Sequence, residues 1–174
     1  MQGELGPYKT VQVGLVSRDP NRESILAAFV PLKQARLAQL LEDVSVDSIG
    51  ALVPVHALGA EDPRTIAGHY LADQLVQEYG GEKVSVGSLD HEGAYRALVD
   101  LHVRFALNAG YNFEIALTGA KMHAVAAGMF ASTAQPAAVY YSAPQSFVTD
   151  KFTRGTGVTR IVHLRRAEVP PRPV

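Results

Sequence analysis

The stretch from Phe113 to Phe130, FEIALTGAKMHAVAAGMF, decides the fold of this chain. An apolar strand passes through a small polar turn into a helix whose apolar residues recur on one face. At such a junction the first helical amide groups lack intrahelical acceptors and lie near the carboxyl end of the strand. Thr118 and Lys121 add a hydroxyl and an ammonium group, so the turn has the outline of an anion site. The alternative, in which Thr118 caps the helix and Lys121 is a solvated residue, stays open at this point.

Composition restricts the class of protein. With 174 residues, 47% of them hydrophobic, the chain is expected to form one compact domain. Its apolar runs stop short of the roughly 20 residues of a membrane span, and its start lacks an export signal, so we expect a cytoplasmic protein. The absence of cysteine excludes disulfides and thiolate chemistry. A net charge of -1 argues against general coating of nucleic acid.

Strand and helix patterns alternate along the chain. After an irregular lead-in at residues 1–10, the alternation in Val11–Val16 predicts the first strand. Asp19 and Pro20 then favour a helix through Val30 that breaks at Pro31, before a second helical run with Leu37, Leu40 and Leu41. Further strands are expected at 48–56, 83–89, 113–117, 137–141 and, antiparallel or at an edge, 158–164. Further helices are expected at 65–79, 92–108 and from residue 121, and the tail 165–174 is expected to be flexible or a linker stump.

Strands that alternate with helices predict an α/β domain over residues 11–164. The expected architecture is a Rossmann-like, doubly wound, mainly parallel sheet of five to six strands with helices on both faces. In the strand order 3-2-1-4-5 the winding reverses between the first and fourth strands. The turn at residues 17–22 is then expected to meet the turn at 118–121, so that Arg18, Arg22 and Lys121 surround one cleft. The favoured ligand is a phosphate-bearing anion.

The strand Glu114-Ile115-Ala116-Leu117, the turn Thr118-Gly119-Ala120-Lys121-Met122 and the later Tyr140-Tyr141 resemble the CRISPR-associated Rossmann-fold sensor domains, or CARF domains. Similar domains carry a Thr-Gly-Gly-Thr-Lys-like turn, which is one residue longer than the turn here and has glycine where this chain has Ala120. The resemblance implies a cytoplasmic homodimer of antiviral defence that binds cyclic oligoadenylate across a two-fold cleft. It also implies that an effector domain commonly follows the sensor.

The same resemblance implies which residues contact the ligand. These are Thr118, Gly119 and Lys121, with Ser17, Arg18 and Asn21 from the other turn. The predicted ligand-binding set also includes their neighbours Arg22, Ala120 and Met122. No cofactor and no metal are expected, because the histidines are too dispersed for a zinc set. The turn after the first expected strand has no Gly-x-Gly-x-x-Gly fingerprint, which disfavours nicotinamide chemistry.

Several other polar groups have structural and functional interpretations. His123 lies in the first turn of the helix expected from residue 121. It is either a functional group, as a ligand contact or a general acid, or an ordinary partly buried residue. Asp90 is expected to cap the helix that follows it rather than to join His91 and Glu92 in a metal site. The segment Gly155–Gly157 fits either a phosphate-binding nest or a turn before the last strand.

Three functions therefore stand as hypotheses. The first is a homodimeric sensor of a cyclic oligonucleotide. The second is a metal-independent ring nuclease on the same site, in which Lys121 and Arg18 stabilise the charge that develops as a ribose hydroxyl attacks. The third is a protein-interaction module without enzymatic activity. Direct binding to duplex nucleic acid and to membranes is not expected.

Overall fold

The computed structural model describes residues 4–14 and 17–147. Residues 6–145 form one compact unit, and a second unit comprises residues 1–5 and 146–174, of which only residues 4–5 and 146–147 are described. The expected strand at 158–164, the turn at 155–157 and the tail from residue 165 lie outside the described residues. The fold below is that of the larger unit.

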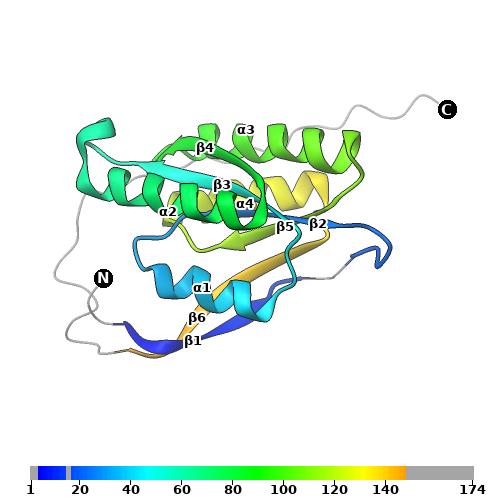
Figure 1. Cartoon of the computed structure of the whole chain (residues 1–174), viewed down its shortest axis with the longest axis horizontal. Coiled ribbons are helices and arrows are strands. Elements are labelled where there is room, and N and C mark those ends of the chain that lie inside the picture. Colours follow the sequence, from blue (N-terminus) through cyan, green and yellow to red (C-terminus); the bar gives the residue numbers. More distant parts are fainter. Residues whose placement is uncertain (1–3, 15–16, 148–174) are drawn as a thin grey trace. The chain divides into compact units, whose positions relative to one another are not determined.

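Six strands form one sheet in the order β1-β6-β5-β2-β3-β4 (Figure 1). Four neighbouring pairs, β2 with β3, β2 with β5, β3 with β4 and β5 with β6, are parallel. Strand β1 runs antiparallel to β6. Just after β1 the Val13 amide donates to the Val139 carbonyl and the Ser17 amide to the Ala137 carbonyl, so the two segments run in opposite directions. The strands are β1 Glu4–Gln12, β2 Ser24–Phe29, β3 Ser48–Val55, β4 Gly81–Gly87, β5 Asn112–Leu117 and β6 Ala138–Phe147.

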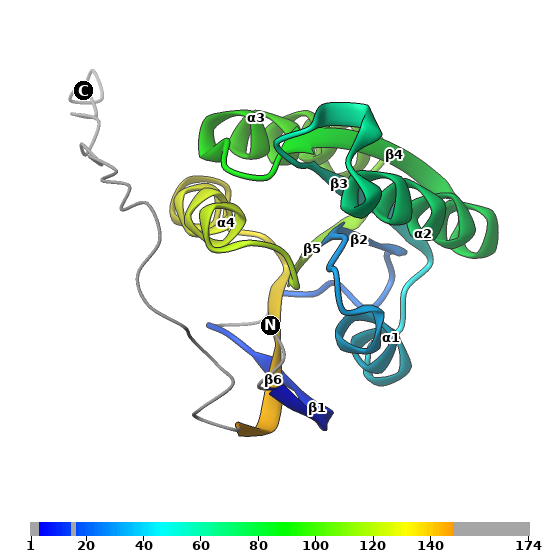
Figure 2. The ribbon, with the colours of Figure 1, turned by 90° about the vertical axis from the view of Figure 1, so that its left-hand side faces the viewer.

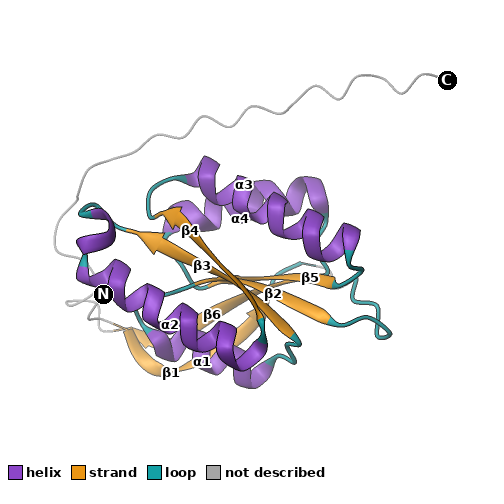
Figure 3. Cartoon of the chain, turned by 45° about the horizontal axis from the view of Figure 1, so that its top comes forward, coloured by secondary structure: helices purple, strands orange, loops and turns teal. Residues whose placement is uncertain are grey.

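Helices cover both faces of the sheet (Figures 2 and 3). Helices α1 and α2 pack on one face and α3 and α4 on the other. Short 3-10 and π-helical turns, η1 and η2, precede α2 and follow α3. The bounds are α1 Gln34–Asp43, η1 Gly59–Glu61, α2 Pro63–Tyr79, α3 His91–His102, η2 Val103–Asn108 and α4 Lys121–Ala134. The predicted α/β, Rossmann-like class is confirmed.

The central strand β2 corrects the sequence prediction, which placed a helix at these residues. All six of its side chains are buried, with Ile25 facing α3 and α4 and Leu26 facing α1 and α2. A strand buried on both faces reads as a continuous apolar run, which a helical pattern also fits over so short a length. Of the first strand expected at 11–16, only residues 11–12 are strand: they end β1 at the edge of the sheet, Val11 and Val13 are exposed, and residues 15–16 lie outside the described residues. Residues 4–10, expected to be irregular, belong to β1 as well.

The parallel strands follow the order 3-2-1-4-5, but β2, and not the segment expected at 11–16, is the first strand of that order. The five parallel strands run β4-β3-β2-β5-β6, and β1 adds a sixth at the edge. Strand β2 pairs with both β3 and β5, so the winding reverses between β2 and β5. The crevice of a doubly wound sheet therefore lies at the carboxyl ends of β2 and β5. These ends lead into residues 30–33 and 118–121.

The turn at residues 17–22 is on the opposite edge of the sheet. It precedes β2, whereas the turn at 118–121 follows β5, and the two strands are parallel neighbours. The expected meeting of the two turns within one chain is therefore wrong. The prediction failed because it placed the first strand at 11–16. Residues 17–22 then seemed to follow a strand, whereas they precede β2.

The other elements follow the predictions with shifted ends. Helix α3 stops at His102 and continues as η2, where one continuous helix to residue 108 was expected. Strand β6 extends to Phe147, well past the expected end at residue 141. The single helix α1 confirms the second helical run, with Leu37 and Leu40 buried. Asp90 caps α3 by accepting the Gly93 amide, as expected.

Candidate functional site at the carboxyl edge

Thr118 ties the end of β5 to the end of β2. Its side chain is buried, and its hydroxyl donates a hydrogen bond to the Phe29 carbonyl. This hydroxyl was predicted to contact a ligand, but in the structure its proton serves the backbone of the neighbouring strand. Thr118 therefore holds the two loops of the switch point in one arrangement.

Gly119 is needed for the close packing of this turn. A Cβ atom added there would lie 2.6 Å from the Phe29 Cβ and 2.7 Å from the His123 Nδ1. Distances this short require a neighbour to move, so a side chain at this position would separate the turn from β2. The glycine thus allows the turn to lie directly against Phe29 and His123.

Helix α4 starts in the turn and presents its first amide groups at the carboxyl edge. It begins at Lys121, whose side chain is exposed, and Ala120 and Met122 beside it are partly exposed. Helix α1 starts at the same edge, at Gln34, five residues after β2 ends at Phe29. Two helix N-termini, each carrying partial positive charge, therefore flank the switch point together with the Lys121 ammonium group.

His123 forms the floor of the turn. Its side chain is fully buried and its ring stacks on Phe29, with centroids 4.6 Å apart. Its Nδ1 accepts the Ala120 amide at 3.3 Å, and its Nε2 lies 3.1 Å from the Gly87 carbonyl. Burial lowers the pKa of His123, and the Gly87 hydrogen bond only partly opposes this. The ring is therefore neutral at pH 7 and has both nitrogens engaged, which argues against the general-acid interpretation.

Replacing Thr118 with valine is expected to lower the free energy of unfolding by about 1 to 2 kcal/mol. Valine keeps the shape of the side chain but leaves the buried Phe29 carbonyl without its hydroxyl donor. Urea denaturation measures the loss. The matched control is Thr133→Val on α4, where an exposed hydroxyl bonds to helical carbonyls and the expected change is within about 0.5 kcal/mol. Equal losses in the two variants would contradict the role given to Thr118.

Three histidines make the fold sensitive to acid. Burial is the first cause of a lowered pKa at His56, His102 and His123, and the Arg64 charge adds to it at His56. Below about pH 6.5 the unfolded chain binds protons that the folded chain does not, so stability falls as the pH decreases. Each histidine lowers the free energy of unfolding by at most about 1.4 kcal/mol for each pH unit of acidification. Urea denaturation between pH 8 and 5.5 should show a plateau above pH 7 and a decline below it, and a rise on acidification would contradict this.

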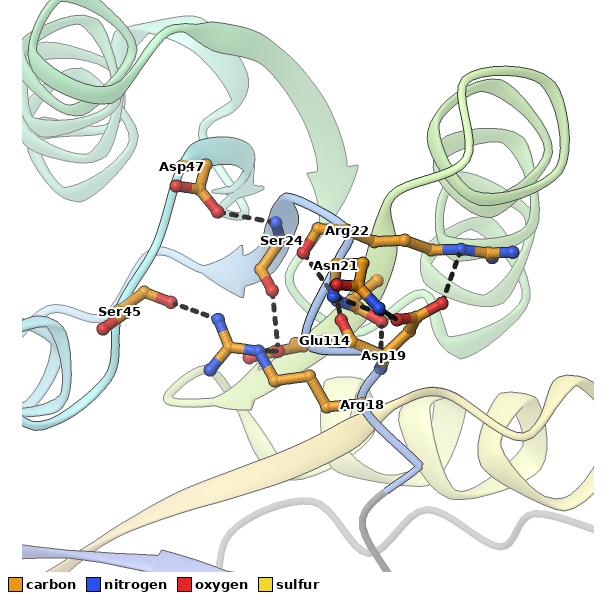
Figure 4. A network of polar contacts seen from close by, with 9 residues as sticks. Arg18, Asp19, Asn21, Arg22, Ser24, Ser45, Asp47 and Glu114 are labelled. Carbon is orange, nitrogen blue, oxygen red and sulfur yellow. Dashed lines mark hydrogen bonds and ion pairs between the residues drawn. The ribbon is translucent and has the colours of Figure 1, made fainter.

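The remaining predicted ligand residues precede β2, at the amino edge, where Figure 4 shows Arg18, Asn21 and Arg22. Ser17 donates its amide to Ala137, and Asn21 bonds to Asp19 through its amide and side chain. The sequence predicted Arg18 and Arg22 to be free for phosphate. In the structure Arg18 Nε lies 3.3 Å from Glu114 Oε1, and Arg22 Nε lies 3.2 Å from Asp19 Oδ2. Figure 4 shows the two guanidinium groups pointing in different directions.

An open depression of about 550 Å³ lies at this amino edge. Its lining carries two arginines and two acidic residues, so it has no excess of positive charge with which to hold phosphate. The lining residues are Arg18, Pro20, Asn21, Arg22, Glu23, Ser45 and Asp47. The amino edge is therefore a polar network that holds the fold together, and the carboxyl edge is the better candidate site.

Two residues of this network were missed by sequence reasoning. The buried Glu114 accepts from the Ser24 hydroxyl at 3.1 Å, and its charge adds to burial in raising the pKa of Tyr140 to about 12. Asn112 exchanges hydrogen bonds with the Asp19 backbone and also donates to the Arg22 carbonyl. A glutamate inside the apolar run of β5 was the available signal, because a buried carboxylate requires a partner.

No protein-family model matches the chain, and no curated protein matches it. Among the described residues, no group of three or more histidine, cysteine, aspartate or glutamate side chains is placed to hold a metal ion. Over the same part of the chain, no helix has the length and apolar character needed to cross a membrane.

Proposed function

We propose that this chain is a nucleotide-sensing regulatory domain that binds a phosphate-bearing ligand at the carboxyl edge of the sheet, between β2 and β5. The observation that carries the proposal is the switch point, where the N-termini of α1 and α4 flank the turn that ends in Lys121. An anion at this position meets the positive ends of two helix dipoles and an exposed ammonium group.

Cyclic oligoadenylate is the proposed ligand class, on the resemblance of the turn to CARF domains. Such a ligand repeats its phosphates around a ring, so two copies of one turn related by a two-fold axis would each hold equivalent phosphates. Exposed leucines in the loops after β2, β3 and β4 support this proposal, because they offer apolar surface to bases or to a second copy. They are Leu32, Leu58 and Leu89, with 63%, 70% and 51% of their surface exposed.

Binding without cleavage is the favoured form of this function. The histidine nearest the turn is buried, neutral and hydrogen-bonded through both nitrogens. Arg18, which was paired with Lys121 in the ring-nuclease hypothesis, lies at the other edge of the sheet and pairs with Glu114. The turn therefore offers charge stabilisation from Lys121 but not the second cation of that mechanism.

Replacing Lys121 with alanine is expected to weaken the binding of cyclic oligoadenylate at least about tenfold. A hydrogen bond between ammonium and phosphate contributes about 1.5 to 3 kcal/mol, and tenfold corresponds to about 1.4. Isothermal titration calorimetry with cyclic tri-, tetra- and hexa-adenylate measures the affinity. The control Lys9→Ala removes the same charge from an exposed position on β1 and should leave it unchanged.

Chromatography of the titrated samples separates the functions. Heat of binding without new products supports the sensor. A product that disappears in Lys121→Ala would support the ring nuclease instead. No heat with any of the three ligands would overturn both and leave the interaction module.

A further inference from the structure

The ring of His123 contacts the carboxyl ends of three strands or the loops that follow them. It stacks on Phe29 of β2, its Nε2 lies 3.1 Å from the carbonyl of Gly87 at the end of β4, and its Nδ1 lies 3.3 Å from the Ala120 amide after β5. The side chain is fully buried, although it comes from the first turn of α4 beside the exposed Lys121. One side chain thus connects the proposed ligand turn with the ends of two other strands, β2 and β4.

The partners of the ring determine which nitrogen carries the proton. The Ala120 amide can only donate, so Nδ1 must present a lone pair to it. The Gly87 carbonyl can only accept, so Nε2 must carry hydrogen. Only the neutral tautomer protonated at Nε2 satisfies both partners, because a proton on Nδ1 would face the amide hydrogen.

We infer that His123 is a positioning residue of the anion turn, which holds the Ala120 amide, and with it the start of α4, only while its ring is neutral. Protonation at Nδ1 releases this amide and turns the N-terminus of α4 away from the ligand. Acid should therefore weaken phosphate binding. The place of the ligand rests on the proposed function, but the link between the ring and the turn does not.

The direction in which affinity changes with pH distinguishes a positioning residue from a residue that contacts the phosphate directly. A histidine that touched the phosphate would bind it more tightly on gaining a positive charge. Two titratable groups act on His123: Asp90 at the start of α3 favours protonation, and His56 after β3 opposes it. Lys121, two positions earlier on the same helix, has an exposed side chain. Burial outweighs the Asp90 charge and lowers the pKa of His123. The transition is thus expected on the acid side of pH 6.5.

Nuclear magnetic resonance of the full chain tests the inference in two stages. In the ligand-free protein, ring nitrogen shifts at pH 7.5 should report the tautomer protonated at Nε2. As the ring titrates on further acidification, the Ala120 amide should shift together with it. A ring protonated at Nδ1 at pH 7.5 would overturn the inference. So would an Ala120 amide whose chemical shift stays constant while the ring titrates. The wild-type protein suffices for this stage, so it stands even if a variant fails to fold.

Calorimetry with cyclic tetra-adenylate over the same pH range supplies the second stage. Affinity should fall with the protonation of the ring, by about tenfold where the ring is largely charged, and His123→Gln should remove this pH dependence. The control His69→Gln, on α2, should retain it. Constant or rising affinity across the pH range in which the first stage shows the ring to titrate would overturn the inference. No binding at any pH would overturn the proposed function, and the first stage would still decide the role of His123.

Discussion

Replacing Arg18 with methionine is expected to lower the free energy of unfolding by about 3 kcal/mol. The Glu114 carboxylate is buried in β5 and Arg18 supplies its counter-charge, with 1% and 33% of the two side chains exposed. Removing one partner of a buried pair leaves an uncompensated charge and costs about 3 to 5 kcal/mol. The lower value applies because Arg18 is partly solvated. Arg18 Nη2 also donates to the Ser45 carbonyl, and that bond is lost as well.

Arg22→Met is the matched control for this prediction. The Arg22 and Asp19 side chains are 56% and 41% exposed, and an exposed pair is worth about 0 to 1 kcal/mol. The double variant Arg18→Met with Glu114→Gln should recover part of the loss, since the buried charge is then removed. Urea denaturation at pH 7.5 compares the three proteins. Similar losses for Arg18→Met and Arg22→Met would contradict the assignment of Glu114 as a buried partner.

Replacing Phe29 with alanine is expected to lower the free energy of unfolding by about 3 to 5 kcal/mol. The side chain is fully buried at the end of β2, stacked on His123 and adjacent to Gly119. Truncating a buried aromatic ring loses its transfer free energy and leaves a cavity. The loss is measured by urea denaturation. At this position the cavity opens directly beneath the candidate ligand turn.

Phe130→Ala distinguishes the site from the general core. Phe130 is also fully buried and packs against Phe113 and His102 at 5.5 and 5.4 Å between ring centroids, so its truncation should cost a similar amount. Only Phe29→Ala should change the magnetic resonance signals of the His123 ring and the Ala120 amide. If those signals are unchanged in Phe29→Ala, or change equally in both variants, the description of the turn is wrong.

The strands β3, β4, β5 and β6 were predictable because each is a short apolar segment bounded by turn residues or by a helix with its own end signals. Strand β2 was not predictable in the same way. Its run SILAAFV shows no alternation, since both faces of β2 are buried, and Asp19-Pro20 ahead of it resembles the start of a helix. In the structure Asp19 accepts the Asn21 amide and belongs to a turn.

Half of the candidate site was accessible from the sequence for a physical reason. A strand that leads directly into a helix places the intervening turn at the carboxyl edge whatever the rest of the fold, which located residues 118–122. The position of residues 17–22 depended on which segment was the first strand, and the pairing of their arginines depended on contacts such as that of Arg18 with Glu114, 96 positions later. Such contacts exist only after the sheet has assembled.

The central claim is that the ligand binds where β2 and β5 end. Titration of the isotope-labelled full chain with cyclic tetra-adenylate, followed through backbone amide shifts, tests it most directly. The account predicts that the largest shifts fall in residues 30–33 and 118–123. Shifts confined to residues 17–22 and 45–47, or no shifts at saturating ligand, would contradict it.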